Sequence, residues 1–191
     1  QRALADKMQL VGIDIDKNRC SAIKLAFEII DKIGICNLVS VNGGSKENAI
    51  PSVCEIVFTA SEVDFGICDD FKQTVKKEFS DNNCNIVINN VVVSDFVLSD
   101  EDTQNIIKSV IEIPNGIKCM NSTIPTLVQT SSNIGVVTTE EDCVTFDISV
   151  RSSVSKEKSD IAEDIRRILE KYGFEVKLHG DYPSWEFKEQ S

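Results

Sequence analysis

The sequence predicts an α+β fold in which an antiparallel sheet carries helices on one face. Two observations lead to this class. Several short runs are rich in β-branched residues, and between them apolar residues recur every three or four positions, the spacing of an amphipathic helix. Strand-like runs also follow one another directly in two places, which favours hairpins joined by helical crossovers.

The first half of the chain is predicted to have the element order β-α-β-β-α-β. Its strands are expected at residues 8–12, 35–41, 53–59 and 85–93, and its helices at residues 21–33 and 65–79. The first helix has apolar side chains at Ile23, Phe27, Ile30 and Ile33 and stops before Gly34, as helices often do at glycine. This order is typical of the ferredoxin-like fold.

The second half repeats the order less completely, as α-β-β-α-β. Its helices are expected at residues 99–113 and 155–173 and its strands at 132–139, 144–150 and 174–178, with 117–128 irregular or partly extended. Ser99 begins the first of these helices, and Asp102 forms a capping-box pattern with it, although Asp is a poorer partner than Glu.

The two halves together predict a duplicated ferredoxin-like βαββαβ arrangement. We expect one domain over residues 1–191, with halves of about 1–96 and 97–191. The junction is short and has no linker rich in proline or glycine, so the halves should share one structural unit.

Composition excludes several classes of function. The 191 residues carry 20 Lys and Arg against 31 Asp and Glu, and a net charge of −11 argues against nucleic acid or an anionic membrane as a partner. No stretch approaches the roughly 20 apolar residues of a membrane helix, and the N-terminal residues lack the apolar core of a signal peptide. We therefore expect a cytoplasmic protein. The seven cysteines show no CxxC spacing.

Few residues are candidates for catalysis. His179 is the only histidine, so a histidine-based metal site or a catalytic triad has little to build on, and a polar residue at a strand end is the simpler interpretation. Arg151 follows the predicted strand 144–150, where its guanidinium could bind a carboxylate through two hydrogen bonds. A solvated ion pair is the alternative for Arg151, and the residues alone leave both open.

A set of collinear motifs resembles one family. Residues 42–51, NGGSKENAIP, resemble the Gly-Gly-x-x-x-Asn-Ala-Ile-Pro motif of the di-zinc aminopeptidases and dipeptidases that include aminoacyl-histidine dipeptidase (Xaa-His dipeptidase, peptidase D). Further stretches resemble that enzyme in the same order: residues 14–19 with 22–24, then 113–116, 129–137, 150–152 and 180–185. Matches spread over nearly the whole chain are more specific than any single motif.

The matching stretches resemble the lid domain of these enzymes, also called the satellite or dimerisation domain, which has a ferredoxin-like fold. The resemblance implies that this chain holds no catalytic residue, metal ligand or cofactor of its own, and that two zinc ions belong to the catalytic domain of the parent enzyme, a metallo-dipeptidase. It implies that Asn48 and Arg151 bind the terminal carboxylate of a dipeptide as the lid closes. The implied partners are the chain's own catalytic domain, the dipeptide and a second copy in a homodimer, although internal duplication could instead leave a monomer.

The chain departs from the family pattern at one important point. The family has a Gly-Gly-His motif after the first strand, whose histidine is thought to stabilise the oxyanion, whereas Gly12 runs directly into Ile13 and Asp14. Ser184 also stands where glycine is usual. The alternative function is a stand-alone ferredoxin-like module that binds an amino acid or forms a dimer.

Overall fold

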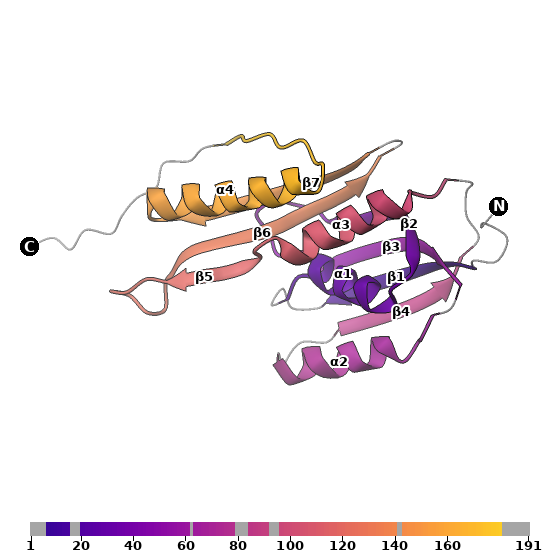
Figure 1. The fold of residues 1–191 in the computed structure, drawn as a ribbon. Coiled ribbons are helices and arrows are strands. Elements are labelled where there is room, and N and C mark those ends of the chain that lie inside the picture. The colour runs from indigo at the N-terminus through magenta and orange to yellow at the C-terminus, as the bar shows by residue number, and fades with distance from the viewer. Residues whose placement is uncertain are drawn as a thin grey trace, which may run out of the picture.

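The computed structural model describes residues 7–15, 20–61, 63–78, 84–91, 96–140 and 143–180, and in the first strand the only side chain described is that of Ile13. The described residues form one antiparallel seven-stranded sheet and four helices. The helices lie on the same side of the sheet (Figure 1). The α+β class with helices on one face is therefore confirmed.

The first half has the complete ferredoxin-like order. Its elements are β1 (Lys7–Ile15), α1 (Ala22–Ile33), β2 (Cys36–Gly44), β3 (Val53–Ala60), α2 (Ile67–Glu78) and β4 (Cys84–Asn90). The strands lie in the order β4-β1-β3-β2, and every neighbouring pair is antiparallel. Because β3 lies between β1 and β2, α1 must cross over it, as the predicted order requires.

The second half extends the same sheet. Its elements are α3 (Asp100–Glu112), β5 (Gly116–Met120), β6 (Val128–Thr139), β7 (Val144–Ser152) and α4 (Ser155–Lys171). The long strand β6 pairs with β7 along one edge, and along its other edge it pairs first with β5 and then with β2. One strand thus joins the two halves into a single sheet.

The predicted strand at residues 174–178 is wrong, because these residues form no strand. In the stretch expected to be irregular or partly extended, the extended part is β5. The alternating apolar residues that predicted a strand instead pack against the core without pairing to another strand. Phe174 meets the ring of Phe146 edge-on at 5.4 Å, and Val176 also packs against the core. The backbone N–H of Phe174 donates to the carbonyl of Leu169 at the end of α4.

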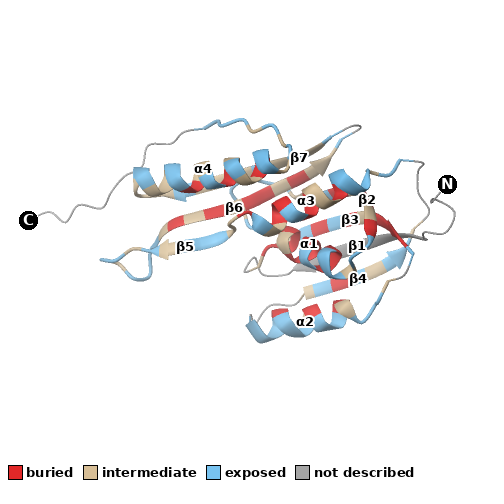
Figure 2. Ribbon diagram, in the orientation of Figure 1, coloured by how far each residue is buried: buried red, intermediate tan, exposed pale blue. Residues whose placement is uncertain are grey.

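The hydrophobic core lies between the sheet and the helices (Figure 2). On α1, the residues expected to face inward include Ile23, Phe27 and Ile30, and all three are fully buried. They lie on the same face because residues three and four positions apart share one side of a helix. The core continues into the second half through Ile107 and Ile134, both of which are also buried.

Two helices begin at serine N-caps, of which the one at Ser99 was predicted. Ser21 accepts a hydrogen bond from the backbone N–H of Lys24 at the start of α1. Ser99 accepts one from the backbone N–H of Asp102 (3.0 Å) and donates its own hydroxyl to the Asp102 carboxylate (2.6 Å). In a standard capping box the acidic side chain accepts a hydrogen bond from the backbone N–H of the cap residue. Here it accepts one from the cap hydroxyl instead, so the pairing is a variant of that motif.

Lys24 links the helices of the two halves. Its Nζ donates to the carbonyls of Val110, Ile111 and Ile113, at 2.7, 3.0 and 3.3 Å, at the end of α3. The last turn of α3 contains no basic residue. Lys24 on α1 therefore supplies the cation that a helix C-terminus favours. Burial of this ammonium lowers its pKa.

We expect Lys24→Met to lower the free energy of unfolding by about 1.5–3 kcal/mol, the usual contribution of a hydrogen bond to a charged group, because a single ammonium serves all three carbonyls. Methionine keeps the aliphatic part of the side chain, so packing changes little. Lys108→Met on the exposed side of α3 is the matched control. Urea unfolding of both variants provides the comparison, and equal stability of the two would contradict this role.

Candidate carboxylate-binding face

Asn48 lies in the loop between β2 and β3. The loop makes a tight turn in which the N–H of Ala49 donates to the carbonyl of Lys46 (3.2 Å), and Asn48 is exposed at this turn. After Pro51 the chain is held to the start of α1, where the N–H of Ala22 donates to the Pro51 carbonyl (2.9 Å). The motif predicted to bind substrate is thus an ordered loop at the end of the first hairpin.

The loop is docked against β6. The side-chain amide of Asn133 donates to the carbonyls of Glu47 (3.2 Å) and Ala49 (2.7 Å), the residues on either side of Asn48. Two glycines allow this close approach. A Cβ on Gly44 would lie 1.9 Å from the carbonyl oxygen of Gly135, and a Cβ on Gly135 would lie 2.3 Å from the carbonyl oxygen of Glu47.

Arg151 lies near the end of β7, directly opposite Ser131 of β6. On β6 the side chains of Thr130, Ser132 and Ile134 are buried toward the helices, whereas Ser131 and Asn133 are only partly buried. Side chains two positions apart on a strand share a face, and so do directly opposite residues.

We call this side of the two strands the open face; it carries Ser131, Asn133, Ser149 and Arg151. The register makes Asn133 and Arg151 diagonal neighbours, about 7–8 Å apart between Cα atoms. Because Asn133 contacts the loop of Asn48, the two predicted binding residues lie on the same side of the sheet. Arg151 is exposed, and within the described part of the chain no carboxylate lies at ion-pair distance from it.

The opposite side of β6 carries a polar network that the sequence did not predict. Glu157, in the first turn of α4, accepts hydrogen bonds from the hydroxyl of Thr130, the amide of Gln129 (2.8 Å) and the thiol of Cys119 (3.4 Å). These bonds hold the pKa of its carboxyl below the usual range. The sequence feature that could have indicated this network is a pair of hydroxyl residues, Thr130 and Ser132, two positions apart on one strand. Once such hydroxyls are buried, they need hydrogen-bond partners.

This network also fixes the end of β7. The hydroxyls of Thr130 and Ser152 are 2.7 Å apart, and Ser152 accepts a hydrogen bond from the backbone N–H of Val154 (3.0 Å). Ser152 follows Arg151 directly, so the backbone at Arg151 is held by contacts on the helix-covered side while its side chain extends from the other.

His179 is exposed and lies outside any helix or strand, on the segment after α4 that was predicted to be a strand. The neighbouring motif at residues 181–185 lies outside the described residues. In the part of the chain that the structure describes, no group of three or more His, Cys, Asp or Glu side chains could hold a metal ion. These residues therefore do not fit the two zinc ions that the resemblance implies for the parent enzyme.

Gly12 lies within a continuous strand. β1 pairs with β3 and with β4 along its length, and Gly12 is opposite Glu55 on one side and Val87 on the other. The position at which the family has a Gly-Gly-His motif is therefore occupied by the central strand of the first half. The same strand continues to Ile15 without interruption.

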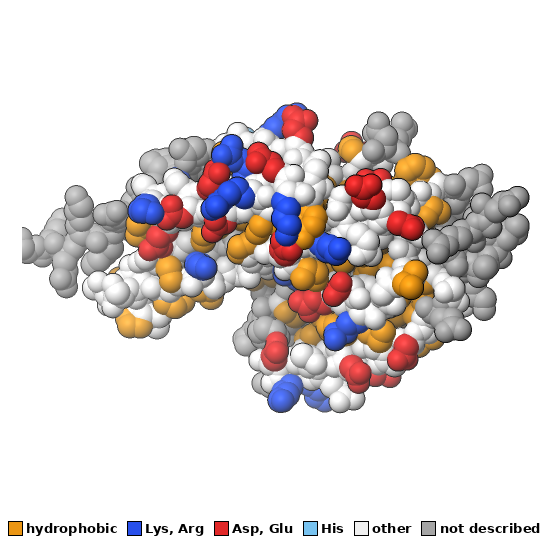
Figure 3. Space-filling model, viewed as in Figure 1, with side chains coloured by type: hydrophobic (Ala, Val, Ile, Leu, Met, Phe, Trp, Pro, Cys, Tyr) orange, Lys and Arg blue, Asp and Glu red, His pale blue; other side chains and the backbone are white. Residues whose placement is uncertain are grey.

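Surface charge is mixed. The face in Figure 3 carries acidic and basic side chains close together, and the described residues on that face form no continuous basic patch. Several of the charges are paired on α4, where Lys156 binds Asp160 and Arg166 binds Glu163. None of the described helices is long and apolar enough to cross a membrane.

We expect Gly135→Ala to lower the free energy of unfolding by about 1–3 kcal/mol, the usual cost of overpacking, because the new methyl group would displace the backbone of Glu47. Gly66→Ala is the matched control, since its Cβ would meet only the end of the Asp64 side chain, which can move. Thermal unfolding of the two variants tests the contact. A Tm for Gly135→Ala equal to that of the unsubstituted protein would be inconsistent with the close approach.

Comparisons with known proteins agree with the sequence motifs. No family model matches the chain. The chain is 24% identical over 155 residues to the cytosol non-specific dipeptidase of Escherichia coli (strain K12), covering 78% of this chain and 32% of that protein. Its structure matches the aminoacylhistidine dipeptidase of Vibrio alginolyticus with a TM-score of 0.80 and 23% identity, covering 96% of this chain and 41% of that one.

The chain thus spans about a third of the first relative and two fifths of the second. The sequence similarity and the shared fold extend over most of the present chain. The resemblance to the aminoacyl-histidine dipeptidases that the collinear motifs predict is therefore confirmed, for the part of those enzymes that this chain spans.

Proposed function

We propose that this chain is the lid domain of a zinc-dependent aminoacyl-histidine dipeptidase and that it binds the terminal carboxylate of the dipeptide. One observation carries the proposal: Asn133 holds the loop of Asn48 by two hydrogen bonds, and the register puts Arg151 on the same open face as Asn133. The two dipeptidases to which the chain is similar support the class of substrate. As in the cytosol dipeptidase, the site of action would be the cytoplasm.

The chemistry of the two side chains suits a carboxylate. A guanidinium presents parallel N–H donors that match the two oxygens of a carboxylate, and an asparagine amide adds a further N–H donor. Both residues are exposed, and no described carboxylate neutralises Arg151. The open face can therefore receive an anion without first breaking an ion pair.

The role of this chain is to bind and to orient. Peptide hydrolysis itself belongs to the catalytic domain and its two zinc ions, which supply the hydrolytic chemistry when bound. Asn48 and Arg151 fix one end of the dipeptide, so that the scissile bond is presented in a constant position. Closure of the lid over the active site would exclude bulk water and strengthen the ionic contact.

The same proposal assigns residues 1–191 to one domain, with halves of about 1–96 and 97–191. The continuous sheet through β6 and the contacts of Lys24 with the end of α3 support a single unit. A core cluster that contains residues of both halves supports it as well.

We expect Arg151→Ala in the full-length protein to lower kcat/KM for a dipeptide by about 30-fold or more, since removing one partner of a desolvated charge pair costs about 2–5 kcal/mol. Arg151→Lys should recover only part of this loss, because lysine keeps the positive charge but lacks the two parallel N–H donors of the guanidinium. Asn48→Ala should act in the same direction. Steady-state kinetics on a dipeptide and on its C-terminal amide provide the measurement, because the amide has no carboxylate to bind.

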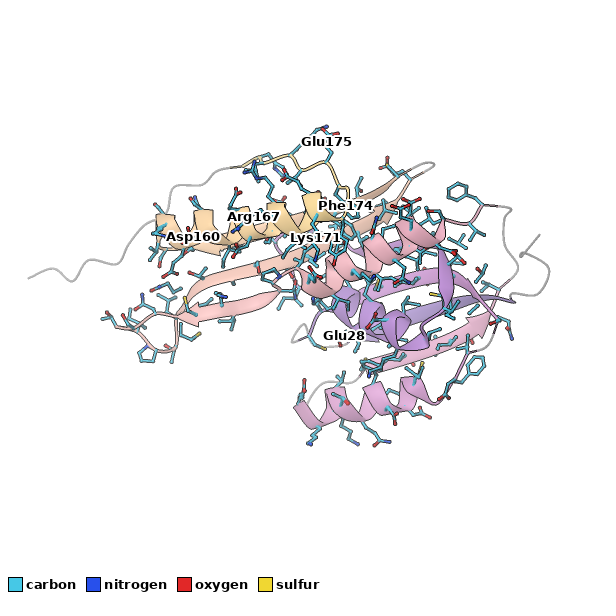
Figure 4. All side chains as sticks on the ribbon, viewed as in Figure 1. Glu28, Asp160, Arg167, Lys171, Phe174 and Glu175 are labelled. Carbon is cyan, nitrogen blue, oxygen red and sulfur yellow. The ribbon has the colours of Figure 1, made fainter. Side chains whose placement is uncertain are left out.

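Arg167→Ala is the control for Arg151→Ala. Arg167 lies on α4 (Figure 4), on the helix-covered side of the sheet. It is paired with Asp164, so its loss removes an arginine that is not on the open face. Its kcat/KM should stay within about twofold of the unsubstituted protein, as surface ion pairs contribute little. Equal losses on the dipeptide and its amide would contradict a carboxylate-binding role for Arg151.

A homodimer is the further partner that we propose, and the edge of the sheet supports it. β5 is the last strand in the order. The exposed apolar side chains on β5, on the loop after it and at the start of β6 are Ile117, Met120, Leu127 and Val128. An unpaired strand edge with apolar side chains is a ready surface for a second chain.

We expect Ile117→Lys in the full-length protein to shift a dimer toward monomer, because Ile117 is 63% exposed on β5 and a charge there opposes apolar contact. Ile35→Lys, at a position that is 86% exposed and next to α1, is the control and should leave the mass unchanged. Size-exclusion chromatography with light scattering measures both. A monomeric unsubstituted protein at high concentration would contradict the proposal.

A further inference from the structure

Asn133 lies on the open face but has no part in the carboxylate contact proposed above. It is directly opposite Ser149 and two residues along β6 from Ser131, which in turn is opposite Arg151. Its side chain is partly buried against the loop that follows β2. The residue therefore stands between the two groups that are proposed to bind substrate.

The hydrogen bonds of Asn133 bracket Asn48. One amide group donates to the carbonyl of Glu47 and to that of Ala49, 3.2 and 2.7 Å away, which uses both of its N–H donors. The carbonyls of the residues before and after Asn48 are thus both held by one residue. A change in the direction of the Asn133 amide would alter the direction in which Asn48 extends.

Among the described residues, no strand pairs with this part of β6 on the side of the loop. The pairing with β5 extends to Ser132, and the pairing with β2 begins at Val136, so residues 133–135 lie between two ladders. Side chains take over the hydrogen bonding here. Asn133 binds the loop, and Asn115 accepts from the backbone N–H of Ile134 at 2.8 Å.

The separation between Asn48 and Arg151 therefore depends on one strand. β6 fixes Arg151 through its register with β7, and it fixes the Asn48 loop through the amide of Asn133. The close backbone contacts of Gly135 with Gly44 and with Glu47 keep the loop near β6, but they do not hold the Ala49 carbonyl on the other side of Asn48, which Asn133 binds.

We propose that Asn133 is a positioning residue that holds the Asn48 amide at the distance from Arg151 at which both can bind one carboxylate. The proposal rests on the function proposed for Asn48 and Arg151 in the preceding section. Asn133 acts through the loop and does not itself contact substrate.

The test uses two substitutions at this position in the full-length protein. Asn133→Ala removes the whole amide, and Asn133→Asp keeps the shape of the side chain but removes the donor, so that misfolding of one variant does not end the test. Both should lower kcat/KM for the dipeptide about ten- to a hundredfold through a higher KM, because a displacement of about 1 Å can cost a factor of that size. On the C-terminal amide the effect should be small.

Asn115→Ala is the matched control. It removes one hydrogen bond to the same segment of β6, at Ile134, without touching the loop of Asn48. A purely structural role for Asn133 predicts that Asn115→Ala and Asn133→Ala lower Tm and kcat/KM alike. A positioning role predicts that Asn115→Ala lowers Tm about as much as Asn133→Ala does. The kcat/KM of Asn115→Ala should nevertheless stay within about twofold of that of the unsubstituted protein.

A double-mutant cycle with Asn48→Ala separates this inference from the proposed function. If Asn133 acts through Asn48, then Asn133→Ala should cause little further loss of kcat/KM once Asn48 is alanine. An equal loss in both backgrounds would overturn the positioning role. The positioning role would also be overturned if Asn48→Ala lowered kcat/KM while neither Asn133 variant did. An unchanged kcat/KM for Asn48→Ala would instead refute the proposed function itself.

Discussion

The close contact between Gly44 and Gly135 is the constraint on which the rest of the structure depends. A methyl group on either residue would collide with backbone atoms, and backbone cannot move aside as the end of a long side chain can. Gly44 also has a φ of 72°, in the region that favours glycine. This contact lets β2 pair with β6, and so joins the ferredoxin-like half to the second half in one sheet.

The strand at this junction separates two chemical environments. The inward hydroxyls of Thr130 and Ser132 are buried and satisfied, the first by Glu157 and the second by the carbonyl of Pro114. The outward side chains face solvent or the Asn48 loop. From Thr130 to Asn133, polar residues at successive positions of β6 therefore face different surroundings, because the two-residue repeat of a strand sends neighbours to opposite sides.

Much of the fold could be predicted from the sequence because its helices and strands are locally consistent. The spacing of Ile23, Phe27 and Ile30 and the cap at Ser21 each favour the helix that is found. The segment at 174–178 could not be assigned, because an alternating pattern does not show whether a partner strand exists, and Phe174 packs on Phe146 instead. Motif resemblance, and not periodicity, led to Asn48. The contact of Asn133 with Glu47 was unpredictable because 86 residues separate them.

The hydrogen bonds around β6 have a mechanical consequence. Asn133 ties the loop to β6, and a ladder of paired residues ties β6 to β7, so the backbones at Asn48 and Arg151 are linked through one strand. If the chain acts as the proposed lid, neither backbone segment would move toward a substrate independently of the other. Closure would carry both together, with the angular change absorbed at a hinge elsewhere in the protein. Their mutual spacing would then be the same before and after closure, and only their distance to the catalytic groups would change.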